Sequence, residues 1–167
     1  MPEDIRLLIG AGQNKIHYVK KFSEYLEKHG INCKLVIDVE TCNGFPSKEI
    51  SQWFTPFKKF NVLVESFKPD AVFIDRQTQF GFGAIKAKIP LLIHLRGNYW
   101  SEVEWAKKNC SIKDKVILSI REKRAEEIFR GSKMILPFSK HLSEIVSEKY
   151  PNKKIEVFHD GLEIKDW

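Results

Sequence analysis

Glycine and polar residues follow five short apolar runs of this sequence, and they include residue types that bind oxyanions, hydroxyl groups or protons. The set comprises Gly10, Gly12, Gln13, Asn14, Asp75, Arg76, His94, Arg96, Gly97, Asn98, Ser139, His159, Asp160 and Gly161. Guanidinium groups bind oxyanions through paired hydrogen bonds. Backbone N–H groups at the start of a helix also favour negative charge. This combination favours binding of a phosphorylated or hydroxyl-bearing ligand.

Arg96 is the strongest single candidate, because it ends an apolar run and is followed by Gly97 and Asn98. A guanidinium fixed at a strand end suits a diphosphate or a phosphorylated ligand. The alternative is an ion pair with an acid such as Asp75 on a neighbouring strand. His94 lies two residues earlier and so on the same face of the strand. It is either a hydrogen-bonded core histidine or a base.

The stretch "GAGQNK", residues 10–15, predicts a turn from a strand into a helix. Its glycines would let a phosphate or a sugar oxygen approach the backbone, with an ordinary tight turn as the alternative. A dinucleotide site would use Asp38 as the acid that binds the ribose. That motif needs a third glycine where Lys15 stands, so the dinucleotide interpretation is disfavoured.

The remaining polar candidates each have a structural alternative. Asp75 and Arg76 could contact hydroxyl groups of a ligand, or Asp75 could cap a helix. Ser139 begins a predicted helix and fits an N-cap better than a ligand contact. His159 and Asp160 either face a cleft or form a plain turn.

The elements that position these residues alternate along the chain. Apolar runs predict strands at 5–12, 33–38, 70–75, 90–97, 133–139 and 154–159. Amphipathic stretches predict helices at 15–29, 51–68, 80–88, 100–108, 113–130 and 140–150. Asn14 is expected to cap the first of them, and Pro56 to bend the second. Residues 39–49 are predicted to form a loop. The alternation predicts an α/β fold with a doubly wound, mainly parallel, Rossmann-like sheet. Residues 1–161 are expected to form a single domain, with ligands at the carboxyl ends of its strands.

Composition limits the class of protein. The chain has 167 residues, 43% of them hydrophobic, and a net charge of +6. It contains no apolar run long enough to span a bilayer and no secretory signal. Three widely spaced cysteines favour reduced, structural thiols, and no cluster predicts a metal site. We therefore expect a cytoplasmic chain without a bound metal or cofactor.

The positive charge favours polyanionic partners. It is concentrated in residues 107–133, where nine Lys or Arg stand against four Asp or Glu, a net +5. The stretch "WFTPFKKF" adds Trp53, Phe54, Lys58 and Lys59, which suit an interfacial membrane contact or an acceptor groove. Packing of an ordinary helix is the alternative.

Five segments, in order, resemble the N-terminal half of a GT-B glycosyltransferase of the retaining family 4 type. They are "YLEKHGINCKLV" (25–36), "KPDAVFIDRQ" (68–77), "KIPLLIHLRG" (88–97), "EEIFRGSKMILPFSKHL" (126–142) and "KIEVFHDGLEIKDW" (154–167). The chain departs from the family pattern at Phe73 and Asp75, where histidines are common. It also has Arg96 where a histidine precedes the glycine.

The resemblance implies an acceptor-binding half of an enzyme that transfers a sugar from a nucleotide-sugar donor to a saccharide, a lipid-linked or another acceptor. It implies residues 162–167 as the start of a linker to a donor-binding domain or subunit. From their place at the end of a strand, Arg96 and His94 are the expected catalytic residues. This chain alone is expected to be inactive, and an anionic face of the inner membrane is an expected contact. A basic, non-catalytic module for an anionic polymer is the alternative, although no nucleic-acid signature is present. A nucleotide-dependent oxidoreductase is disfavoured by Lys15.

Overall fold

Six parallel strands form one sheet in the order β2-β1-β3-β4-β5-β6. The computed structural model describes residues 5–42 and 56–159. Its strands are β1 (Arg6–Ala11), β2 (Asn32–Ile37), β3 (Ala71–Asp75), β4 (Leu91–Leu95), β5 (Met134–Pro137) and β6 (Lys154–Ile155). Its helices are η1 (Gln13–Lys15), α1 (Ile16–Lys28), α2 (Asp38–Thr41), α4 (Lys58–Phe67), α5 (Gln79–Lys86), α6 (Tyr99–Lys108), α7 (Ile112–Gly131) and α8 (Lys140–Lys149). The prediction of an α/β, mainly parallel, Rossmann-like fold is confirmed, and every strand pair of the observed sheet is parallel.

Alternating side chains of the strands build a core on each face of the sheet. On one face Leu8, Ile74 and Ile93 are fully buried, and α4, α5, α7 and α8 pack over them. On the other face Ile9 and Phe73 pack under α1, through Val19 and its neighbours. Strands buried on both sides explain the continuous apolar runs of the sequence.

The strand order changes direction between β1 and β3. The chain crosses from β1 to β2 on one side and then returns over β1 to β3, β4, β5 and β6 on the other. Connections leaving β1 and β3 therefore diverge at their carboxyl ends. In open parallel sheets this switch point is where ligands bind.

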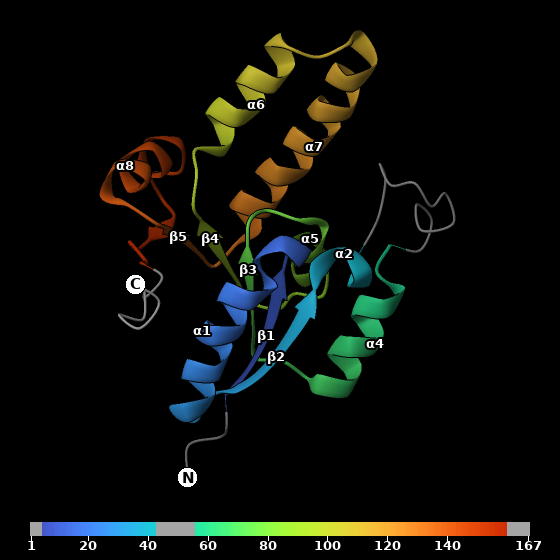
Figure 1. Cartoon of the computed structure of the whole chain (residues 1–167), viewed down its shortest axis with the longest axis vertical. Helices are drawn as coiled ribbons and strands as arrows, with labels where there is room; N and C mark the ends of the chain where they lie inside the picture. The colour runs from blue at the N-terminus through green and yellow to red at the C-terminus, as the bar shows by residue number, and fades with distance from the viewer. Residues whose placement is uncertain (1–4, 43–55, 160–167) are drawn as a thin grey trace.

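Helices α6 and α7 form a long antiparallel pair that extends away from the sheet (Figure 1). Val103 on α6 and Ile128 on α7 are buried at its base. Farther along, Trp105 is 70% exposed and Ile112 is 82% exposed. The base of the pair is thus part of the core, whereas its outer half presents apolar side chains to solvent.

Four local predictions need correction. The sixth strand, predicted at 154–159, is limited to β6, Lys154–Ile155. Residues 38–41, which include the first residues of the predicted loop, form the short helix α2. Asn14 does not cap α1: it lies within η1, whose N-cap is Gly12 without a side-chain hydrogen bond. The predicted helix at 51–68 is described only from residue 56, and its α-helical part is Lys58–Phe67.

Candidate functional site

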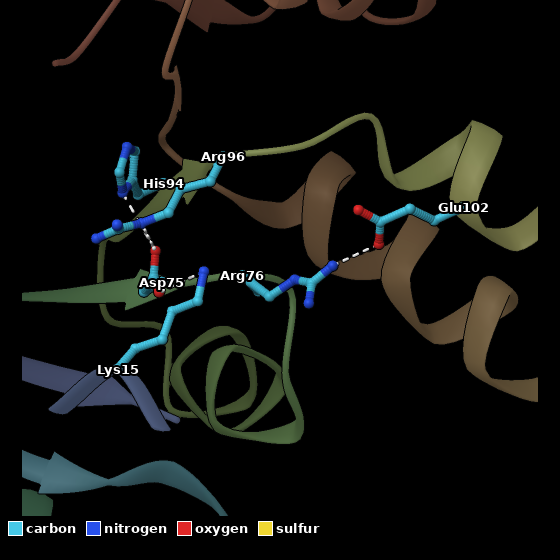
Figure 2. A network of polar contacts seen from close by, with 6 residues as sticks. All are labelled: Lys15, Asp75, Arg76, His94, Arg96 and Glu102. Atoms are coloured by element: carbon cyan, nitrogen blue, oxygen red, sulfur yellow. Dashed lines mark hydrogen bonds and ion pairs between the residues drawn. The ribbon is translucent and has the colours of Figure 1, made fainter. Parts of the chain in front are cut away.

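Asp75 is the centre of a polar cluster at the switch point (Figure 2). It is the last residue of β3, and its side chain is only 1% exposed. Its register partner on β4 is His94, so both side chains lie on the face of the sheet that α1 covers. A carboxylate buried this deeply is stable only with charged or hydrogen-bonding partners.

Three nitrogen-bearing side chains surround that carboxylate. Arg96 Nε donates to Asp75 Oδ1 over 2.9 Å, and His94 Nδ1 lies 3.3 Å from the same oxygen. Lys15 Nζ, at the start of α1, lies 4.0 Å from Asp75 Oδ2. The ion-pair alternative for Arg96 is therefore present in the structure, and capping of a helix by Asp75 is not.

The positive neighbours determine the charge of Asp75. Burial acts to raise the pKa of this carboxyl, but the hydrogen bond from His94 and the charges of Arg96 and Lys15 outweigh it. The pKa of Asp75 therefore lies below its usual value, and the group is ionised at neutral pH. Its Oδ2 atom is buried and has no hydrogen-bond partner among the residues described.

His94 is enclosed more completely than Arg96. Its side chain is 1% exposed, whereas that of Arg96 is 26% exposed. The imidazole packs against Phe158, with ring centroids 5.2 Å apart, and lies near Phe73. This surrounding matches the core-histidine alternative, in which His94 orients Asp75, while Arg96 reaches the surface.

A second buried carboxylate, Asp38, directly follows β2 as the first residue of α2 and is 3% exposed. Its Oδ1 accepts from the Val39 N–H over 2.6 Å. Burial raises the pKa of Asp38 above its usual value, and the hydrogen bond from the Val39 N–H together with the nearby Thr78 side chain offsets this only in part. The negative charge of Asp75 adds to the rise, so the two acids are close enough to influence each other.

Arg76 leaves the sheet on the opposite side from Asp75, as Figure 2 shows. Its φ is +101°, a conformation rare for a residue with a side chain, which costs about 1–3 kcal/mol. Its guanidinium pairs with Glu102 on the first turn of α6, and both side chains are about half exposed. Asp75 and Arg76 are consecutive residues, yet Asp75 belongs to the cluster with Arg96 and Arg76 to the pair with Glu102.

The predicted glycines have different roles. A Cβ on Gly10 would lie 2.6 Å from the buried ring of Phe80, so Gly10 is needed for packing. A Cβ on Gly97 would lie 2.8 Å from Glu102 Oε1, so the Glu102 carboxylate fills that space. Gly12 faces open space, with no atom within 4 Å of such a Cβ. Among these three, Gly12 is the one that leaves room for a ligand.

Helix capping accounts for two other candidates. Ser139 Oγ accepts from the Leu142 N–H over 3.2 Å at the start of α8, as expected of an N-cap. Asn98 Oδ1 accepts from the Ser101 N–H over 3.2 Å and caps α6. Gln13 and Asn14 are exposed on η1 beside Lys15.

The last candidates lie at the margins of the described chain. His159 is exposed and its ring packs edge-on against Phe138, with centroids 5.6 Å apart. Lys58 and Lys59 are exposed on α4, and Lys59 Nζ donates to the Glu40 carbonyl over 3.2 Å. Four predicted residues lie outside the described residues: Trp53, Phe54, Asp160 and Gly161.

The described residues contain neither a metal-ligand cluster nor a membrane-spanning helix. No group of three or more His, Cys, Asp or Glu within residues 5–42 and 56–159 is arranged to hold a metal ion. Within the same ranges, every helix is too short or too polar to cross a bilayer.

Comparison with known proteins identifies the fold. The chain superposes on the crystal structure of a UDP-N-acetylglucosamine 2-epimerase with a TM-score of 0.62 and 12% identity, over 93% of this chain and 48% of that one. A second match, Glycyrrhiza uralensis UGT73P12 complexed with glycyrrhetinic acid 3-O-monoglucuronide, has a TM-score of 0.48 and 12% identity, over 90% and 42% of the two chains. At that TM-score it adds nothing to the assignment. No family model and no curated protein matches the chain. This chain has a Rossmann-like domain of the GT-B type and spans about half the length of that epimerase.

Sequence reasoning did not include three residues of these clusters: Lys15, Asp38 and Glu102. Lys15 is considered only as a departure from a glycine motif, although it ends η1, the turn after β1, and directly precedes α1. Asp38 counted only as a ribose acid. The signal for both was their place after a strand, but the proximity of Lys15 to Asp75 depends on β1 and β3 being neighbours.

Proposed function

We propose that this chain is the acceptor-binding half of a glycosyltransferase that uses a nucleotide-sugar donor. One observation carries the proposal. A buried, ionised carboxylate at the switch point, Asp75, holds the guanidinium of Arg96 at the edge of the sheet where ligands bind. The cations of Lys15 and Arg96 stand beside it.

Each of these groups has a role in binding a sugar. Asp75 does not reach the surface, so it acts by holding the guanidinium of Arg96 in place for the ligand. Arg96 and Lys15 attract phosphate oxygens of the ligand, and the exposed turn at Gly12 brings backbone N–H groups near them. His94 is a positioning residue, because its buried ring contacts Asp75 rather than the surface.

The donor diphosphate must also be stabilised as it leaves, and water must be excluded. We infer that a second domain or subunit completes the site and holds the donor. The protein whose fold this chain shares acts on a UDP-sugar by its name, which agrees with a sugar-nucleotide role. The exposed apolar residues of the α6–α7 pair and the basic segment 107–133 suit an anionic membrane face near a lipid-linked acceptor.

Ligand-observed saturation-transfer NMR tests the proposal. The chain is titrated with neutral sugars, sugar 1-phosphates and UDP-sugars. Lys15 and Lys28 provide a matched pair of substitutions, because they stand at opposite ends of α1. We expect the parent and Lys28→Ala to bind sugar phosphates, and both Lys15→Ala and Arg96→Ala to bind about tenfold more weakly.

Two outcomes contradict the proposal. One is an affinity for sugar phosphates that is the same in the parent and in all three variants, Lys15→Ala, Arg96→Ala and Lys28→Ala. The other is salt-dependent binding of nucleic acid with no response to any sugar ligand, which would favour a module for anionic polymers.

A further inference from the structure

Arg76 and Glu102 border a groove that the Asp75 cluster does not use. The groove lies between the start of α6, α7 and the turn after β3, with a volume of about 630 Å³. Its apolar wall consists of Val103, Trp105, Ala106 and Leu118. Its polar lining includes Arg76, Gln77, Tyr99, Ser101 and Glu102.

We propose that this groove binds a phosphate monoester of an apolar compound, with the phosphate on Arg76 in place of the Glu102 carboxylate. Glu102 already shows where an anion fits. Its carboxylate pairs with the guanidinium of Arg76 and fills the space above Gly97. Glu102 is therefore an internal substitute for the anionic group of the ligand.

Exchange of Glu102 for a ligand is energetically easy. Both partners of the ion pair are about half exposed, at 48% and 52%, and exposed pairs contribute little to stability. A ligand carboxylate would offer the same charge as Glu102. A phosphate monoester carries up to two negative charges and three acceptor oxygens, so it competes better for the guanidinium.

Two further observations indicate a ligand. Arg76 is held at a φ of +101°, and strain of this kind persists where the surrounding structure imposes it, often at binding sites. Gln77 lines the same groove, and its Oε1 is buried without a hydrogen-bond partner among the described residues. A hydroxyl or N–H group of the ligand can supply that missing donor. Trp105 and Leu118 then cover the apolar part of the molecule.

This site is separate from the one proposed for sugar binding, since Asp75 and Arg76 point to opposite sides of the β3 end (Figure 2). The inference therefore goes beyond the proposed function and does not depend on it. If sugar transfer is also correct, the groove would hold the phosphate-bearing apolar part of an acceptor.

Calorimetric titration with octyl phosphate, below its micelle concentration, tests the inference. Octyl glucoside serves as the neutral amphiphile and inorganic phosphate as the anion without an apolar chain. We expect octyl phosphate to bind at least tenfold more tightly than either. Glu102→Gln should tighten octyl phosphate binding severalfold, because the competing charge is removed.

Arg76→Gly separates binding from folding. Glycine suits a φ of +101°, so this variant should unfold at the same temperature as the parent or higher, yet bind octyl phosphate at least tenfold more weakly. Lys68→Gly is the matched control, because Lys68 also has a positive φ, of +50°, but ends α4 outside the groove. Equal octyl phosphate affinity in the parent and a folded Arg76→Gly overturns the inference, as does equal binding of octyl glucoside. Either result leaves the sugar-binding proposal standing, because it is tested through Lys15 and Arg96.

Discussion

Arg96 donates its Nε hydrogen to Asp75 Oδ1 over 2.9 Å, which joins a cation that reaches the surface to a carboxylate that does not. The bond links the carboxyl ends of β4 and β3 beside the point where the strand order reverses. Asp75 thereby holds Arg96 in one place, and Arg96 keeps Asp75 ionised despite its burial. Structure and ligand binding at this edge therefore depend on the same pair.

Asp75→Asn should lower the free energy of unfolding by about 2–4 kcal/mol at pH 7, because Arg96 and His94 lose their charged partner. Folding lowers the pKa of Asp75. The contribution of its charge to the free energy of unfolding is therefore fully present at pH values above the ordinary pKa of the group. This stabilising contribution is lost as the pH falls through the lowered pKa that Asp75 has in the folded chain. Urea unfolding from pH 7 to pH 2 should show the difference between parent and variant shrinking at the acid end.

Glu65→Gln is the control for that measurement, since Glu65 is exposed on α4. The free energy of unfolding of Glu65→Gln should equal that of the parent at every pH. A constant difference between parent and Asp75→Asn down to pH 2 would show that Asp75 does not contribute through its charge.

Asp38→Asn should raise the free energy of unfolding at pH 7. The pKa of Asp38 is raised by burial, so the charged form disfavours the fold, and the amide oxygen of Asn can still accept from the Val39 N–H. The stabilising contribution of protonated Asp38 is fully present below its ordinary pKa and is lost as the pH rises through the raised one. The gain in Asp38→Asn should therefore disappear in acid, as measured by thermal unfolding at pH 7 and pH 3. A loss of stability at pH 7 would indicate that the charge of Asp38 is favourable.

Gly10→Ala and Gly12→Ala should differ although the residues are two positions apart. In Gly10→Ala the new methyl group meets the ring of Phe80, which is fully buried against Phe60, and we expect a loss of about 1–3 kcal/mol. Gly12 has an ordinary φ of −67° and open space beside it, so Gly12→Ala should change stability by less than about 0.5 kcal/mol.

Chemical denaturation compares the two glycine variants, and sugar-phosphate titration of Gly12→Ala adds a test of the site. The methyl group would narrow the approach to the backbone, so affinity should fall while stability does not. Equal destabilisation by both substitutions would place Gly12 in the core and remove it from the site.

The sequence predicted the strands well because burial on both faces leaves long apolar runs such as that ending at Leu95. The ion pair of Arg96 with Asp75 could be considered in advance, since carboxyl ends of parallel strands share one edge. The approach of Lys15 to Asp75 could not, because it requires β1 and β3 to be neighbours. Contacts between distant segments, such as Phe80 on Gly10, likewise depend on packing that no local pattern encodes.

Similar limits apply to the polar residues of the turns. The Ser139 cap follows from local sequence and is present as predicted. Glu102 above Gly97 depends on the direction in which α6 leaves the sheet, and the positive φ of Arg76 has no signature in residue type. The core environment of His94 could not be predicted either, because it depends on Phe158, which follows 64 residues later in the chain.

Ligand binding at the Asp75 and Arg96 edge of the sheet is tested by a map of backbone amide shifts in the ¹⁵N-labelled chain on titration with sugar 1-phosphates and UDP-sugars. We expect shifts that saturate at residues 12–15, 75 and 96, around the carboxylate of Asp75, and that are lost in Arg96→Ala. Saturating shifts confined to the opposite edge of the sheet, at residues 30–32, 68–70 and 88–90, would contradict this expectation.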